Sequence, residues 1–141
     1  MRAEETPLLL DTCAVIWIDS GEPIAQAASH ALNAAYAAGL DKYVSPITAW
    51  EVGMLVARGR LKFRIRPQIW FEQLLALPGM ALAELSPDIL IGSSFLPGTP
   101  PRDPSDRIIA ATAREFGYRL VTRDRVLLDY AASGHIQALA C

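Results

Sequence analysis

Cysteine is scarce in this 141-residue sequence, which contains only Cys13 and Cys141 and no Cys-x-x-Cys pair. A disulfide framework and a cysteine-based metal site are therefore excluded, and we expect two free thiols. Long apolar runs are also missing, because the run at residues 13–18 is far shorter than the roughly 20 residues that span a bilayer. No secretory signal is recognisable, since Asp11 interrupts the apolar residues near the N-terminus. We expect a cytoplasmic protein without membrane contact.

No sign of charge dominates, since 13 Lys and Arg residues stand against 15 Asp and Glu residues. The clear basic excess of many nucleic-acid-binding domains is thus absent. One segment nevertheless alternates cations with Leu61 and Phe63, a pattern that gives an extended chain one basic and one apolar face. This segment is either a solvated edge strand or loop, or a strip that contacts phosphates. Its five cations are Arg58, Arg60, Lys62, Arg64 and Arg66.

The length and the apolar content of 52% fit one ordered domain over residues 1–141. Short apolar runs alternate with helical patterns, which predicts an α/β fold with a parallel sheet. The predicted strands are Leu8–Asp11, Tyr43–Ser45, Ala81–Leu85, Arg119–Thr122 and Ile136–Leu139. The predicted helices are Thr12–Ile18, Ile24–Ala38, Ile47–Arg58, Gln68–Leu77, Pro87–Phe95, Pro104–Phe116 and Arg125–Ala132.

Three acidic residues stand where a helix is expected to begin. Asp11 and Asp124 each follow an apolar strand, and Asp106 lies in the first turn after Asp103 and Pro104. Helix capping and the helix dipole alone would explain each of them. Two acids at positions 103 and 106 are nevertheless more than one cap requires.

Glu51 has no such explanation, because its predicted helix carries it inside an apolar stripe. A buried and unpaired carboxylate costs several kcal/mol. Glu51 therefore requires a basic partner, a pKa raised until the group is neutral, or a metal ion. A structural salt bridge, or a stripe edge that still reaches water, is the alternative. The stripe consists of Ile47, Trp50, Met54 and Leu55.

These four carboxylates are expected to converge, because ligand sites in open parallel sheets form beyond the carboxyl ends of the strands, where the strand order reverses. Like charges a few ångströms apart cannot all ionise without compensation. Hard oxygen ligands, with no histidine or cysteine among them, suit Mg²⁺ or Mn²⁺. The sequence therefore predicts a metal site formed by Asp11, Glu51, Asp106 and Asp124.

Four segments, in this order and at this spacing, resemble the PIN domain, and specifically the VapC-type toxin nucleases of type II toxin–antitoxin pairs. The resemblance covers nearly the whole chain. Pro101 and Ser105 depart from it, because similar proteins often carry a histidine and an aromatic residue at these places. The four segments are Leu8-Leu-Leu-Asp11-Thr12, Ser45-Pro-Ile-Thr-Ala-Trp50-Glu51 with Gly59-Arg60-Leu61, Asp103-Pro-Ser-Asp106-Arg107-Ile-Ile-Ala-Ala-Thr-Ala113, and Leu120-Val-Thr122-Arg123-Asp124.

The resemblance implies a three-layer α/β/α fold with a five-stranded parallel sheet, and a metal-dependent endoribonuclease whose catalytic and metal-binding acids are the four named above. Thr12, Asp103 and Thr122 would support these acids. Arg107 and Arg123 are candidates for RNA contact or for counter-ions of the acids. Similar proteins form homodimers and are silenced by a VapB-like antitoxin.

The expected reaction is hydrolysis of RNA, in which Mg²⁺ activates water and stabilises the charge of the transition state. One competing class is excluded, because a haloacid-dehalogenase-like phosphatase needs a second aspartate where Cys13 stands. Two alternatives are left open. One is a non-catalytic protein of the same fold that binds RNA or a partner, and the other is a nuclease that cuts DNA.

Overall fold

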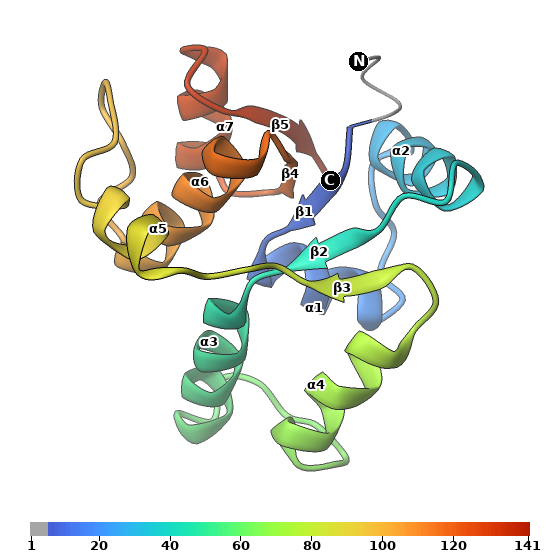
Figure 1. Cartoon of the computed structure of the whole chain (residues 1–141). Coiled ribbons are helices and arrows are strands. Elements are labelled where there is room, and N and C mark those ends of the chain that lie inside the picture. Colours follow the sequence, from blue (N-terminus) through green and yellow to red (C-terminus); the bar gives the residue numbers. More distant parts are fainter. Residues whose placement is uncertain (1–5) are drawn as a thin grey trace.

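The computed structural model describes residues 6–141, which form one five-stranded sheet with helices on both faces (Figure 1). Residues 1–5, on which part of the argument against a secretory signal rests, lie outside the described residues. The predicted parallel sheet is confirmed, because every neighbouring pair of strands is parallel. The strands are β1 (Leu8–Leu10), β2 (Lys42–Val44), β3 (Met80–Leu82), β4 (Arg119–Thr122) and β5 (Gln137–Ala140).

Seven helices occur within the described residues, as predicted. The largest difference in a helix lies at the end of α5, which stops three residues before the predicted Phe95. There the Ser93 hydroxyl donates to the carbonyl of Leu90 at 2.6 Å and the chain turns. The helices are α1 (Thr12–Asp19), α2 (Gln26–Ala37), α3 (Pro46–Ala57), α4 (Pro67–Ala76), α5 (Pro87–Gly92), α6 (Pro104–Phe116) and α7 (Arg125–Ala132).

Strand β3 is also shorter than the predicted Ala81–Leu85. Its register pairs Leu82 with Val44, the last residue of β2. The next residue, Ser45, already caps α3 by accepting a hydrogen bond from the amide of Ile47. Because β2 ends there, β3 has no neighbour with which to continue pairing.

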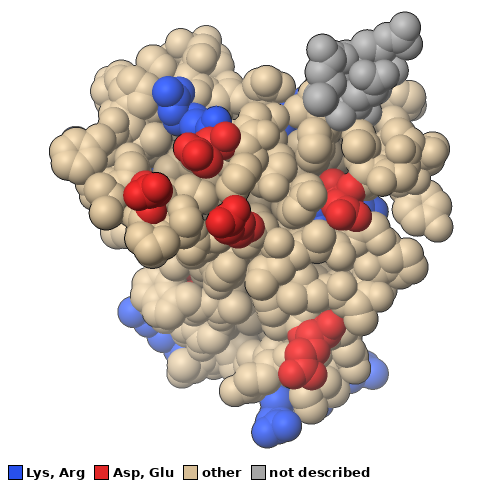
Figure 2. Space-filling view, in the orientation of Figure 1, with Lys and Arg blue, Asp and Glu red and all other residues tan. Residues whose placement is uncertain are grey.

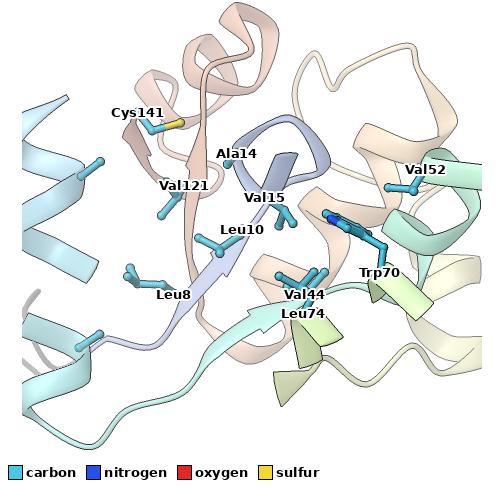
Figure 3. Close-up of a cluster of buried hydrophobic side chains, with 12 residues drawn as sticks. Leu8, Leu10, Ala14, Val15, Val44, Val52, Trp70, Leu74, Val121 and Cys141 are labelled. Atoms are coloured by element: carbon cyan, nitrogen blue, oxygen red, sulfur yellow. The ribbon is translucent and has the colours of Figure 1, made fainter. Parts of the chain in front are cut away.

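The central strand β1 is buried on both faces, and its alternating leucines separate two cores. Leu8 and Leu10 pack in a first core with residues of α1, α2 and α4, including Val15 and Trp70 (Figure 3). Leu9 lies in a second core formed largely by α6 and α7. The sheet is thus a middle layer between two layers of helices, which confirms the three-layer α/β/α fold.

The predicted apolar stripe of α3 is wrong. The side chains that α3 buries belong to Thr48 and Val52, whereas Trp50 is 56% exposed and Glu51 is half-buried. This helix is apolar on nearly every side, so the spacing of its apolar residues did not indicate which side faces the core. Glu51 lies at the edge of the core, one turn from the buried Thr48.

The basic segment is no strand, since residues 59–66 form turns and bends between α3 and α4. The predicted separation of its two faces nevertheless holds in part. Leu61 and Phe63 pack against the first core, and the Phe63 ring stacks on Trp70 with 4.5 Å between the ring centroids. The five cations are exposed. The segment is therefore a loop that is anchored by its apolar residues.

Candidate functional site

The strand order reverses between β1 and β4, because β2 and β3 lie on one side of β1 while β4 and β5 lie on the other. Asp11 directly follows β1 at this point and is only 4% exposed. Its Oδ1 accepts a hydrogen bond from the amide of Ala14 at 2.7 Å and so caps α1. Its Oδ2 accepts a hydrogen bond from the hydroxyl of Thr122, the last residue of β4. Asp11 is therefore a helix cap and also part of a cross-strand contact.

Asp124 is held beside Asp11 by the same threonine. Its amide donates to the Thr122 hydroxyl at 3.0 Å. Its Oδ1 accepts from the amides of Val126 and Leu127 at 2.8 and 3.1 Å, which caps α7. One carboxylate oxygen is engaged in these capping bonds, so the other can face a ligand.

A chain of two threonines positions Glu51. The Thr12 hydroxyl donates to Oε1 of Glu51 at 2.6 Å, so it must accept the hydrogen bond from the Thr48 hydroxyl, which lies 2.9 Å away. Both threonines are buried, and Thr48 is fully inaccessible. Thr48 was not among the site residues predicted from the sequence. The available signal was a hydroxyl one helical turn before Glu51 on an otherwise apolar helix.

Asp103 and Asp106 have different structural roles at the start of α6. Asp103 is exposed, and its Oδ2 accepts from the amide of Asp106 at 3.0 Å, which makes Asp103 the cap. Asp106 is half-buried in the first turn. Ser105 between them is buried, with 4% of its surface exposed.

Electrostatic repulsion links these acids. The pKa of Asp106 is raised to about 7, first by burial and then by the negative charges of Asp124, Asp103, Glu51 and Asp11, in that order of importance. Four carboxylates from four parts of the sequence therefore act on one group. A cation bound beside this carboxyl would favour its ionised form and lower its pKa.

The pKa values of Asp11 and Glu51 are also raised by burial. Burial raises the pKa of Asp11, against the lowering effect of the hydrogen bonds from Thr122 and Ala14. Burial also raises the pKa of Glu51, and the hydrogen bond from Thr12 opposes it. The hydroxyl groups around the acids thus favour the ionised forms, which are the forms that bind a metal ion.

The same four acids also affect the pKa of the Cys13 thiol. It is exposed and free, and its pKa is raised to about 11, first by burial of the sulfur and then by Asp11, Glu51, Asp106 and Asp124. The negative charges of the four predicted site acids therefore all act on one thiol. Cys141 is the other free cysteine, as predicted, and is buried.

The set of donors fits a hard divalent cation, because the clustered groups present carboxylate and hydroxyl oxygens. Among residues 6–141, no three acidic, histidine or cysteine side chains are drawn together closely enough to form a ready-made metal centre. The carboxylates nevertheless act on one another electrostatically, because charges of the other acids raise the pKa of Asp106, Asp11 and Glu51. A cation would lower that repulsion and allow them to approach.

The predicted cations fall into different surroundings. Arg107 donates from Nη1 to the carbonyl of Ser93 at 3.4 Å, which is a contact within the protein. Arg123 is exposed, with its guanidinium carbon 4.0 Å from the centroid of the Trp17 ring. In Figure 2 acidic and basic side chains form small separate patches among uncharged residues, with basic side chains at the lower edge, over the part that holds α3 and α4.

The place where the strand order of a parallel sheet reverses is its switch point. Acids grouped there define an α/β protein whose ligand site lies at the carboxyl edge of the sheet. The family model of the PIN domain matches residues 8–133, and the chain belongs to the PIN-domain family. It is 35% identical over 127 residues to "Ribonuclease VapC22" of Mycobacterium tuberculosis, a match that covers 89% of this chain and 92% of that protein.

Solved structures share this fold. VapBC2 from Rickettsia felis, bound to a DNA fragment from its promoter, has a TM-score of 0.66 at 15% identity, covering 94% of this chain and 97% of that one. A toxin–antitoxin complex from Klebsiella pneumoniae has a TM-score of 0.59 at 24% identity, covering 94% and 95%. No helix within residues 6–141 is long and apolar enough to cross a membrane.

Proposed function

We propose that this protein is a metal-dependent endoribonuclease and acts as the toxin of a type II toxin–antitoxin pair. The observation that carries the enzymatic part is the mutual repulsion of Asp11, Glu51, Asp106 and Asp124 at the switch point of the sheet. The ribonuclease and toxin parts rest on the name of the 35% identical relative and on the toxin–antitoxin complexes that share the fold.

Asp11, Asp106 and Asp124 would bind Mg²⁺, or Mn²⁺ in its place, directly or through water. When bound, such an ion supplies an activated water at neutral pH and neutralises charge on the phosphate. Glu51 would take a second ion or orient the attacking water, and Thr12 would hold its carboxylate in place. Thr122 would keep Asp11 ionised and fixed, and Asp103 would hold the first turn of α6 that carries Asp106.

RNA would reach this edge with its phosphates along exposed cations. The exposed cations of the α3–α4 loop and Arg123 are the groups proposed for phosphate contact. Arg107 is a weaker candidate, since its guanidinium already contacts the carbonyl of Ser93. The proposal also includes a homodimer in the cytoplasm and a cognate VapB-like antitoxin that blocks the site.

The test is cleavage of a panel of RNAs by purified protein with Mg²⁺, with Mn²⁺ or with EDTA. We expect cleavage that EDTA abolishes, and a loss of at least about 100-fold in Asp11→Asn and Asp124→Asn, as for removal of a group that stabilises transition-state charge. Asp41→Asn is the matched control, because Asp41 is an exposed acid in the loop before β2. Cleavage in EDTA, or full activity of both site variants, would contradict the proposal.

The toxin role has a separate test. Expression of the protein should arrest growth, Asp11→Asn should not, and a co-expressed antitoxin should relieve the arrest. A protein that binds RNA without cutting it, and arrests growth equally as wild type and as Asp11→Asn, would instead be a non-catalytic regulator. Parallel assays on DNA of the same sequence distinguish a ribonuclease from a DNA-directed enzyme, because only RNA offers the 2′-hydroxyl.

A further inference from the structure

A hollow of about 500 Å³ adjoins the acidic cluster, and Asp103 and Asp106 are among the residues that line it. One wall is the loop of residues 99–102. The other wall is one face of α7, which contributes residues at the spacing i, i+3, i+4 and i+7. The residues of this face are Val126, Asp129, Tyr130 and Ser133.

The loop wall is fixed before any ligand arrives. The Tyr130 hydroxyl donates to the carbonyl of Pro97 at 2.6 Å, which ties the loop to α7. Gly98 has φ of +68°, and its backbone lies so close to the His135 ring that a Cβ there would come within 2.3 Å of Nε2. Pro100 and Pro101 have a restricted φ, and Pro101 is buried. A fixed wall requires little ordering when a ligand binds, which favours affinity.

The lining of the hollow suits a flat group with apolar faces and a polar edge. Pro100 is half-buried and offers part of its ring surface, and the Val126 side chain is 52% exposed. Asp129 is exposed on the same face of α7 and provides a carboxylate that accepts hydrogen bonds. Arg102 on the loop is exposed and provides a positive charge beside the acids. The volume lies within the range of small-molecule sites.

We propose that this hollow binds the base of the nucleotide beside the scissile phosphate, and that the base is guanine. Guanine alone among the four bases of RNA presents two adjacent N–H donors on one edge, and these match the two oxygens of the Asp129 carboxylate. The Pro100 ring and Val126 contact its faces, and Arg102 contacts the next phosphate. This inference rests on the proposed function, because the hollow is an extension of the same site.

Sequence recognition in RNA generally requires an unstacked base whose edge is exposed, so the substrate is single-stranded at this position. The scissile phosphate then lies over Asp106 and the base points away from the acids. Without a bound cation, the negative charges of Asp103 and Asp106 at one end of the hollow disfavour a phosphate inside it, whereas a neutral base is tolerated.

The first experiment measures kcat/KM on four short single-stranded RNAs that differ only in the base next to the cut. We expect a preference for guanine in the wild type. Asp129→Asn should lower kcat/KM for the guanine RNA about tenfold, as for loss of a bidentate base contact, and should change the other three less than twofold. Arg102→Ala should raise KM on all four RNAs and leave kcat unchanged. Asp41→Asn should change none of these values.

The second experiment needs no catalysis. Metal-free protein is titrated with guanosine monophosphate, uridine monophosphate or inorganic phosphate, and the amide NMR signals of Thr99 and Ser133 are followed. We expect saturable shifts with guanosine monophosphate only, and their loss in Asp129→Asn. RNA cleavage without base preference, together with equal shifts for both nucleotides, would overturn the base site and leave the proposed function intact. Guanosine monophosphate binding by a protein that cuts no RNA would support the base site and overturn the proposed function.

Discussion

The hydroxyl of Thr122 connects the two acids at the switch point, because it donates to Oδ2 of Asp11 and accepts from the amide of Asp124. These residues end or follow the adjacent parallel strands β1 and β4. Thr122 is fully buried, so no water can replace it. A single side chain therefore connects Asp11 with the backbone of Asp124 and favours the ionised form of Asp11 against the effect of its burial.

Thr122→Val should destabilise the protein and weaken catalysis. Valine has the same shape but leaves a buried carboxylate oxygen without its donor, at a cost of about 1–3 kcal/mol. The Asp11 pKa should rise further, since the Thr122 hydrogen bond lowers it. Urea unfolding and RNA cleavage measure the two effects. Thr122→Ser keeps the hydroxyl and should approach wild type, so equal losses in both variants would contradict this role.

Thr12→Val should lower RNA cleavage about 10-fold to 100-fold, as is usual when a group that orients a metal ligand is removed. The change leaves Glu51 without its donor and Thr48 without its acceptor. Steady-state kinetics at several Mg²⁺ concentrations should show that the variant needs a higher Mg²⁺ concentration for half-maximal activity. Thr12→Ser is the control, and unchanged activity in Thr12→Val would exclude the positioning role.

Asp106 gives the metal-free protein a stability that depends on pH. Its pKa is about 7 in the folded chain, above the ordinary value of 3.8. The folded state therefore holds its proton more tightly, so this contribution to stability is fully present below about pH 4 and is lost as the pH rises through 7.

Asp106→Asn removes this dependence because the amide does not ionise. In EDTA the variant should match wild type near pH 4 and exceed it at pH 8, on the order of 1 kcal/mol, because water screens a half-buried carboxylate. Thermal unfolding across this pH range measures the difference. Asp41→Asn should show no such trend, and a parallel pH dependence for Asp106→Asn and wild type would contradict the interpretation.

Gly98→Ala should destabilise the protein more than Gly39→Ala. Both glycines have φ near +70°, so both substitutions carry a backbone cost of about 1 kcal/mol. A Cβ at Gly39 has nothing within 4 Å, whereas at Gly98 it meets the His135 ring. Denaturant unfolding of both variants isolates the steric part. The excess cost should disappear in a His135→Ala background, and an excess that persists there would refute the steric explanation.

The exposed cations of the α3–α4 loop should contribute to RNA affinity. Replacing Arg60, Lys62 and Arg64 together by alanine should raise KM and reduce the slope of log affinity against log salt by about 2, the value for three contacts to a single strand. Binding titrations at several salt concentrations measure the slope. Arg60→Lys with Arg64→Lys retains the charges and should keep it. An unchanged slope in the alanine variant would show that the loop is a solvated surface.

The sequence was sufficient for the secondary structure where local signals are strong. Pro104 after the cap Asp103, and Gly117 with its positive φ, define both ends of α6 as predicted. Such signals depend on neighbours along the chain, which are the same in any fold. The predicted ends of β3 and α5 were wrong. Pairing with β2 decided where β3 ends, and the hydrogen bond of Ser93 accompanies the end of α5.

The sequence also predicted the site acids, because carboxylates at the ends of strands and helices are visible as residue types in order. It did not indicate what holds them. The hydrogen bonds of the site join residues 111, 39 and 36 positions apart, and only the strand order brings these residues into contact. Thr48 was missed for this reason, and so was the real core-facing side of α3.

Residue type and spacing therefore determined which acids are proposed as cation ligands and in which elements they stand. Tertiary structure alone decided their ionisation, because the pKa of a carboxyl depends on burial and on charges from distant parts of the chain. It also decided that Thr122 serves two acids at once. A hydrogen bond acts over about 3 Å, and folding is what brings residues 11 and 122 within that distance.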